Sequence, residues 1–299
     1  MTIQPPALQQ GDTVAIIATA RKITREELQP AIDLLEQWGL NAVIGRTIGL
    51  DNHQFAGTDE ERRLDLQQAL DDYAVKAIWC ARGGYGTVRI IDALDFSIFK
   101  KNPKWIIGFS DVTALHSHVH NLGYQSLHSI MPITVEGNTN EALNSFKKSL
   151  FCEPLNYNIV TSKHNRIGQT SGELIGGNLS MLYSILGSES AVQTDGKILF
   201  IEDLDEYLYH IDRMMMNLKR NNCFKNLKGL IVGGMTKMHD NTIPFGKNAI
   251  EIIVDNTKEY DFPICFDFPA GHLKDNRSLI MGKTAHLNVS QEFVTLDFN

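Results

Sequence analysis

The chain has 299 residues, of which 43% are hydrophobic and 21% are charged, and its acidic residues outnumber lysine plus arginine by 35 to 28. This composition is typical of a folded protein with one or two domains, and it excludes general disorder. The resulting net charge of −7 argues against a nucleic-acid-binding protein, which would usually present a basic face.

The amino-terminal segment MTIQPPALQQGD has neither the basic nor the apolar region of a signal peptide. No apolar stretch approaches the roughly 18 residues of a membrane span. The cysteines are scattered without a CxxC pair, which favours reduced thiols over a disulfide framework. They are Cys80, Cys152, Cys223 and Cys265. We therefore expect a cytoplasmic protein with no membrane partner.

The first half of the chain alternates short β-rich runs with amphipathic helical patterns. Thr58 and Glu61 form a capping-box pattern at the start of one helix. The predicted strands are Thr13–Ala18, Asn41–Ile44, Ala77–Cys80 and Trp105–Ile107, and the predicted helices are Thr24–Trp38 and Thr58–Asp71. Such alternation predicts a parallel sheet covered by helices.

The stretch 138–169 is polar and shows no long apolar period, so we expect the interdomain connection there. A second α/β unit follows, without a repeat of the first. Its predicted strands are Lys197–Ile201, Gly229–Val232 and Pro263–Phe268, and its predicted helices are Leu204–Arg220 and Asn248–Asn256. The expected domains are residues 1–150 and 165–299.

Ser110 follows the fourth predicted strand, in the sequence Gly-Phe-Ser-Asp, and precedes a probable helix. A serine there projects its hydroxyl from a sharp turn, beside helix amino-terminal N–H groups that could hold an oxyanion. The segment departs from the G-x-S-x-G elbow because Val112 replaces the second glycine. The alternative is that Ser110 merely caps the helix.

The segment 81–86, ARGGYG, follows another strand, and its glycines allow close approach of the backbone to a ligand. The loop could cradle an oxyanion or a phosphate, but it matches neither the Walker pattern nor G-x-G-x-x-G. Cys80, just before this loop, is better interpreted as a buried residue of the strand than as a nucleophile.

Glu202 lies at the end of the apolar strand KILFI, and His272 follows Gly271 after the last clear strand. A carboxylate in such a place can orient a histidine, and a histidine can act as a general base near neutral pH. Alternatively, Glu202 merely lies at a helix amino terminus, where the helix dipole favours an acidic residue, and His272 is a solvated loop residue. His116 and His120 share a helix face that could hold zinc, but no HExxH pattern surrounds them, and we assign no metal.

Ser110, Glu202 and His272 each end a β-run, and sites in open α/β sheets gather at such ends. At this point the chain resembles the LD-carboxypeptidase family of serine peptidases. The motifs that carry the resemblance are GDTVAIIATA near the start, FAGTDEERRLDL at 55–66, ARGGYGTVRI at 81–90, GFSDVTALH at 108–116, GELIGGNLSML at 172–182, ILFIEDLDEYLYHIDRMM at 198–215 and PAGH at 269–272.

The resemblance implies a triad of Ser110, His272 and Glu202, with oxyanion donors on the backbone of Asp111 and Gly84. It implies a flavodoxin-like amino-terminal α/β domain, a smaller carboxyl-terminal α/β domain, a homodimer, and no cofactor. The implied substrate is a murein tetrapeptide that loses its terminal D-Ala. The opening loop Ala18–Arg21 departs from the Pro-Ser that the family usually shows.

A carboxypeptidase must recognise a free carboxylate, and Arg82 beside the glycine loop is a candidate for that contact. Arg82 could equally face solvent or pair with an acid. Three other functions stay open from the sequence. They are cleavage of a microcin C-type adenylate, ligand binding without catalysis, and nucleotide binding at the glycine loop.

Overall fold

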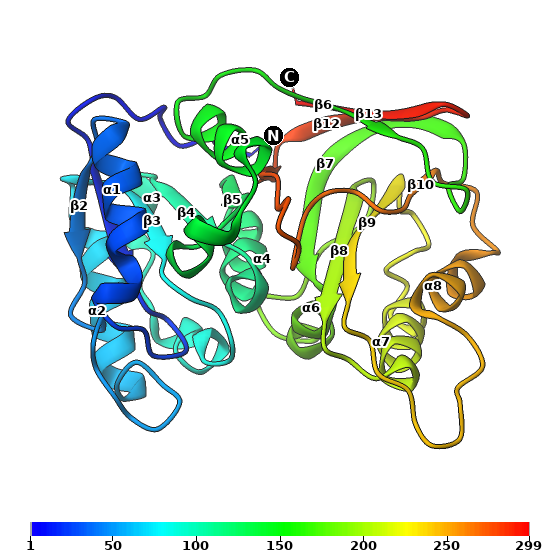
Figure 1. The fold of residues 1–299 in the computed structure, drawn as a ribbon, viewed down its shortest axis with the longest axis horizontal. Helices are drawn as coiled ribbons and strands as arrows, with labels where there is room; N and C mark the ends of the chain where they lie inside the picture. Colours follow the sequence, from blue (N-terminus) through cyan, green and yellow to red (C-terminus); the bar gives the residue numbers. More distant parts are fainter. Residues whose placement is uncertain (1, 299) are drawn as a thin grey trace.

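The computed structural model describes residues 2–298, which form two lobes side by side, each built on its own sheet (Figure 1). The first sheet has the strand order β11-β5-β4-β3-β1-β2. Its strands are β1 (Thr13–Ile17), β2 (Asn41–Ile44), β3 (Val75–Cys80), β4 (Trp105–Gly108), β5 (Ser126–His128) and β11 (Leu279–Met281). Strands β1 to β5 are parallel in the flavodoxin-like order 2-1-3-4-5. The predicted fold class is therefore confirmed for this lobe.

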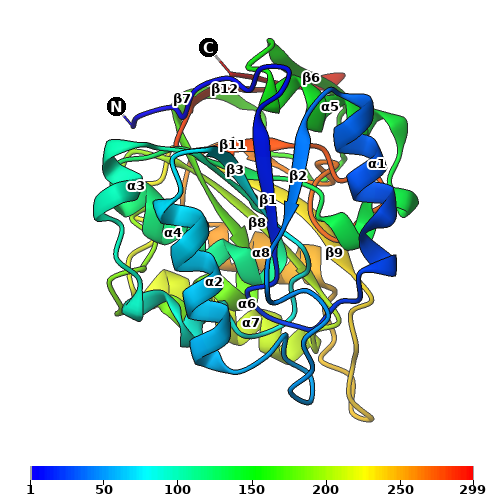
Figure 2. The same ribbon diagram turned by 90° about the vertical axis from the view of Figure 1, so that its left-hand side faces the viewer.

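Five helices cover the first sheet, on both of its faces (Figure 2). They are α1 (Gln29–Gln37), α2 (Asp59–Asp71), α3 (Ser97–Lys101), α4 (Thr113–Asn121) and α5 (Asn140–Leu150). Val14 and Ile16 of β1 belong to the core that contains α1 and α5, whereas Ala15 and Ile17 belong to the core that contains α2, α3 and α4. This alternation is what a strand buried on both faces requires. The capping box predicted for α2 is present.

The second sheet has seven strands in the order β10-β9-β8-β7-β12-β13-β6. They are β6 (Leu155–Val160), β7 (Gly168–Asn178), β8 (Ile198–Leu204), β9 (Gly229–Thr236), β10 (Ile264–Cys265), β12 (Thr284–Val289) and β13 (Phe293–Phe298). Strands β7 to β10 are parallel, and the remaining pairs are antiparallel. One face packs against α6 (Leu179–Ile185), α7 (Leu208–Arg220) and α8 (Ala249–Thr257).

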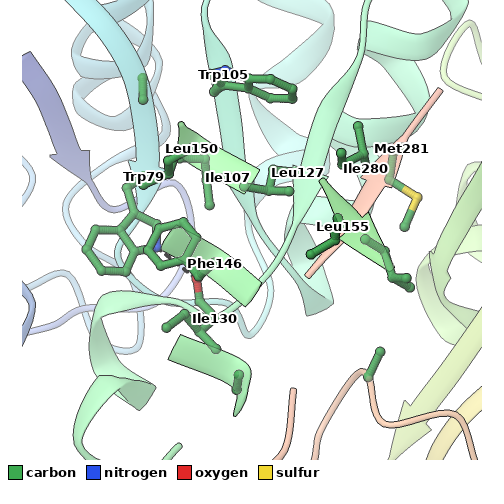
Figure 3. Packing of buried hydrophobic residues seen from close by; sticks show 14 of the residues in the cluster. Trp79, Trp105, Ile107, Leu127, Ile130, Phe146, Leu150, Leu155, Ile280 and Met281 are labelled. Carbon is green, nitrogen blue, oxygen red and sulfur yellow. Dashed lines mark hydrogen bonds between the residues drawn. The ribbon is translucent and has the colours of Figure 1, made fainter. Parts of the chain in front are cut away.

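A single hydrophobic cluster joins the two lobes. Trp79 and Phe146 pack in it with their ring centroids 5.0 Å apart, and the same cluster includes Ile280 and Met281 of β11 (Figure 3). The same cluster continues to Phe200 of β8. Strand β11 belongs to the first sheet, although it lies between β10 and β12 of the second sheet in the sequence. The chain therefore returns to the first lobe at β11 and enters the second sheet again at β12.

Two sequence expectations are corrected. The stretch 138–169 is not only a connection, because it contains α5 and β6. The helix predicted to begin at Leu204 begins at Leu208, because Leu204 is the last residue of β8. Within residues 2–298, no helix combines the length and the apolar character needed to cross a membrane.

Candidate active site

A pocket of about 450 Å³ opens where the carboxyl ends of both sheets meet. The loops after β3, β4 and β5 supply one part of it, and the segments after β7 and β8 supply another. Its lining includes Arg21, Arg82, Gly83, Gly84, Ser110, Asp111, Asn178, Asp203, Asp205, Glu206 and His272. The fold thus brings Ser110 and His272 together, although 162 positions separate them in the chain.

Ser110 comes two residues after β4 and begins a 3-10 helix that continues into α4. Its backbone has φ +63°, in the left-handed region that non-glycine residues rarely occupy. Its side chain makes no capping bond to either helix. The interpretation of Ser110 as a simple helix cap is therefore wrong.

Glu202 and His272 form a hydrogen-bonded pair. Glu202 is fully buried in β8, and its Oε2 accepts a bond from His272 Nδ1 at 2.7 Å and a second from the His272 backbone N–H at 3.0 Å. Burial lowers the pKa of His272, but the charge of Glu202, its hydrogen bond and the nearby Asp203 together raise that pKa above the ordinary 6.5. Because Nδ1 is engaged, Nε2 is the nitrogen that remains for proton transfer.

Among residues 2–298, no hydrogen bond joins Ser110 Oγ to His272 Nε2. The ring of Phe109 packs edge-on against His272, with centroids 4.8 Å apart, so the residue before Ser110 contacts this histidine. Catalytic hydrogen bonds are often long in the free enzyme and tighten when substrate binds.

The glycine loop after β3 packs against the serine. A Cβ placed on Gly83 would lie 3.0 Å from Ser110 Cβ and 3.1 Å from its Oγ. Gly84 has φ +113°, and in the part of the chain that the structure describes its N–H donates to no protein acceptor. The Asp111 carboxylate is buried and accepts from Thr87 N–H, so this side chain anchors the loop instead of facing a ligand. Its burial raises its pKa.

Two arginines line the pocket from the loops after β1 and β3. Arg82, the predicted candidate, donates a 3.4 Å hydrogen bond from Nη1 to the carbonyl of Lys22. The sequence analysis did not identify Arg21, whose stem lies across Gly84, with its Cδ 2.2 Å from where a Cβ would stand there. The local signal for Arg21 was its position in the loop that follows the first strand, four residues after the end of β1.

Asp203 is a second buried acid that the sequence analysis did not single out. It accepts from Asn178 Nδ2 and from Ser180 N–H, which ties the start of α6 to the end of β8. Burial, with the neighbouring Glu202, raises the pKa of Asp203 to about 7. Asp203 lines the pocket, whereas its neighbour Glu202 is fully buried behind His272 and is the carboxylate that bonds to the histidine.

Other sequence candidates lie outside this chemistry. Burial raises the pKa of the Cys80 thiol to about 12, which makes it a poor nucleophile. Both ring nitrogens of His116 are engaged, by Ser126 Oγ and by the carbonyl of Gly108. His120 bonds to Glu173.

Comparison with known proteins identifies the family of the chain. Residues 14–129 match the LD-carboxypeptidase N-terminal domain, and residues 171–287 match the LD-carboxypeptidase C-terminal domain. The chain is 34% identical to a probable murein peptide carboxypeptidase of Bacillus subtilis, over 99% of this chain and 95% of that protein. The chain belongs to the LD-carboxypeptidase family.

Solved structures of similar proteins share its fold. The muramoyltetrapeptide carboxypeptidase from Oxalobacter formigenes superposes with a TM-score of 0.87 at 28% identity, covering 96% of this chain and 98% of that one. The microcin immunity protein MccF, in complex with glutamyl sulfamoyl guanosine, superposes with a TM-score of 0.86 at 21% identity, covering 98% of each chain. At that identity the second likeness concerns the fold alone. This LD-carboxypeptidase family member is a hydrolase of the serine peptidase class.

Proposed function

We propose that the protein removes the C-terminal D-alanine from murein tetrapeptides by hydrolysing an L,D-amide bond. The observation that supports the proposal is that a left-handed Ser110 and His272, which is bonded to the buried Glu202, line one pocket together with two arginines. The proteins named above as murein peptide and muramoyltetrapeptide carboxypeptidases support the choice of substrate.

In the proposed mechanism, Ser110 Oγ attacks the carbonyl carbon of the scissile amide while His272 Nε2 takes its proton. Glu202 holds His272 in the tautomer with hydrogen on Nδ1 and stabilises the imidazolium that forms. The N–H groups of Gly84 and Asp111 stabilise the oxyanion. His272 then returns the proton to the leaving amine, and water hydrolyses the acyl-enzyme by the reverse sequence of transfers.

Recognition of the substrate's terminal carboxylate falls to the arginines. A carboxylate that enters the pocket loses water, and a planar guanidinium compensates with paired, charge-assisted hydrogen bonds. Arg82 and Arg21 line the pocket beside the glycine loop, next to the proposed oxyanion donors. This placement puts the free carboxylate on the side of the first lobe.

The test compares a murein tetrapeptide with the same peptide amidated at its terminal carboxylate. Loss of one charged contact should reduce kcat/KM for the amide by ~100-fold. Ser110→Ala should abolish hydrolysis of both peptides. If the amide is cleaved as fast as the acid, the protein is not a carboxypeptidase, and a microcin-type or broader amidase activity replaces the proposal.

We further propose that the protein acts in the cytoplasm as a homodimer, as its family resemblance implies. Sedimentation equilibrium should then give about twice the chain mass of 33.5 kDa. A single species at the chain mass would contradict the dimer. Fractionation of cells that produce the protein at native levels tests its location.

A further inference from the structure

The loop that carries His272 runs from β10 in the second sheet to β11 in the first. Both lobes hold it. Thr236 Oγ1 donates to the carbonyl of His272 from the second lobe, and Ser129 Oγ bonds to Ser278 Oγ from the first. The position of the proposed base therefore depends on how this loop is folded.

Asn276 is the buried polar residue at the centre of that loop, with only 1% of its surface exposed. Its Oδ1 accepts a 2.8 Å hydrogen bond from the backbone N–H of Gly271. A backbone N–H only donates, so the side-chain amide must turn its oxygen toward Gly271. Its Nδ2 has no hydrogen-bond partner among residues 2–298. Burial of an unpaired donor is unfavourable, so packing alone does not account for an asparagine here.

Gly271 is clamped between Asn276 and the proposed triad. It has φ +100°, and a Cβ placed on it would lie 2.5 Å from Glu202 Oε2. The next residue, His272, uses both its backbone N–H and its Nδ1 to bond to that same oxygen. A rotation about the backbone bonds of Gly271 would therefore displace both the backbone N–H and the Nδ1 of His272 from Glu202.

We propose that Asn276 is a positioning residue, which fixes the Gly271 peptide so that His272 stays seated on Glu202. Its side-chain hydrogen bond reaches neither Ser110 nor His272, so it acts through Gly271. The inference rests on the proposed roles of Ser110, His272 and Glu202. Loss of the Asn276 side chain should slow proton transfer from Ser110 to His272, because a displacement of about 1 Å in a catalytic group can cost ~100-fold in rate.

The experiment measures the rate at which a fluorophosphonate probe labels Ser110 in the full chain, as a function of pH. This readout reports activation of the serine and needs no knowledge of the natural substrate. The variants are Asn276→Ala, which removes the acceptor, and Asn276→Asp, which keeps one. The matched control is Asn256→Ala. Asn256 is an equally buried amide, bonded to Asp212 and to the carbonyl of Ile252.

Asn276→Ala should label at least 10-fold more slowly than the wild type at temperatures well below its Tm. Asn276→Asp should recover most of the labelling rate at high pH. The acid limb of its profile of labelling rate against pH should move to higher pH, because a carboxylate near Glu202 further stabilises the imidazolium of His272. Asn256→Ala should lower Tm and leave the labelling rate unchanged.

The inference is overturned if Asn276→Ala labels at the wild-type rate, or if Asn256→Ala slows labelling equally. It is also overturned if Asn276→Asp is as slow as Asn276→Ala at every pH. Ser110→Ala separates this result from failure of the proposed function. If the wild type labels no faster than Ser110→Ala, the nucleophile assignment itself fails.

Discussion

Ser110 occupies a left-handed conformation at φ +63° that costs a non-glycine residue of order 1–3 kcal/mol. The surroundings enforce it. Gly108 before it has φ +154°, and a Cβ there would lie 2.8 Å from Val112 Cγ2. From this strained turn Ser110 lines the pocket.

Glu202→Gln tests the electrostatic role of the acid. Both bonds from His272 end on one oxygen, so the glutamine carbonyl retains the tautomer while the charge is lost. Glu202 raises the pKa of His272 against the effect of burial, so the substitution lowers that pKa. The acid limb of the kcat/KM profile should move to lower pH by about 1 unit or more, and kcat should fall by ~100-fold.

The control for this substitution is Glu206→Gln. Glu206 also lines the pocket, but it bonds to His210. Its loss should leave the acid limb in place. An acid limb that stays unchanged in Glu202→Gln would show that the charge of Glu202 does not set the ionisation of the base.

At the scale of elements, each strand end contributes one component of the pocket. The loop after β3 brings the glycines, the turn after β4 brings Ser110, and the end of β8 brings Asp203, next to the Glu202 that bonds to His272. These components contact one another closely, as the approach of Gly83 to Ser110 shows. The glycine loop therefore sets the space that the serine side chain can occupy.

Gly83→Ala tests this contact. Its Cβ would stand 3.0 Å from Ser110 Cβ, which is closer than normal packing, so either the loop or the serine must move. We expect kcat to fall by about 10-fold or more, with little change in Tm. Gly137→Ala is the control, because a Cβ on Gly137 meets nothing within 4 Å. Equal kcat in the two variants would contradict the role of the loop.

Local sequence patterns predict most strands of the parallel core but miss α5, and the reason is chemical. The buried face of α5 includes Ser145 and Ser149, which hide its apolar period. Each serine satisfies its hydroxyl by donating to a carbonyl within the helix, so burial is tolerated. Strand β6 was missed because Asn156 and Asn158, of a residue type that is uncommon in strands, alternate with its buried residues Leu155 and Tyr157.

Sequence motifs predicted a site at Ser110, Glu202 and His272, and the structure brings Ser110 and His272 to one pocket, with Glu202 bonded to His272 from within β8. Arg21 and Asn276 could not be predicted in the same way. Arg21 reaches the site only because its stem crosses Gly84, and Asn276 only because its loop closes back on Gly271. Such contacts depend on the tertiary path of the chain, which no local period reports.

At the scale of the whole molecule, the hydrophobic cluster that spans both sheets surrounds polar groups behind the site. His128 is fully buried on β5, and in the described part of the chain neither ring nitrogen has a hydrogen-bond partner. Its ring packs edge-on against Phe200, with centroids 4.9 Å apart. Burial, with the nearby His116 and His272, holds the pKa of His128 well below 6.5.

This depressed pKa makes folding sensitive to acid. As the pH falls below about 6.5, the unfolded chain binds a proton at His128 that the folded chain does not, so stability is lost. His128→Phe removes this effect. We compare the free energy of unfolding of His128→Phe with that of the wild type at each pH. The difference, variant minus wild type, should rise by up to about 2 kcal/mol from pH 8 to pH 5, at about 1.4 kcal/mol per pH unit. Any steric cost of the ring cancels in that difference.

Chemical denaturation at the two pH values measures the effect. His286→Phe serves as control because His286 is exposed on β12. Its stability relative to wild type should not change with pH. The same pH response in both variants would place the acid sensitivity elsewhere in the molecule.

The pairing of β11 with the first sheet also affects when that sheet can be completed during protein synthesis. A ribosome releases residues 126–128 of β5 long before residues 279–281, their partners in the ladder. During synthesis the β5 edge of the first sheet therefore stays unpaired until residues 279–281 have emerged. Exposed strand edges pair readily with other chains. The loop that carries His272 also emerges after the strands that precede Ser110 and contain Glu202, so the proposed catalytic site is completed only when this loop has been made.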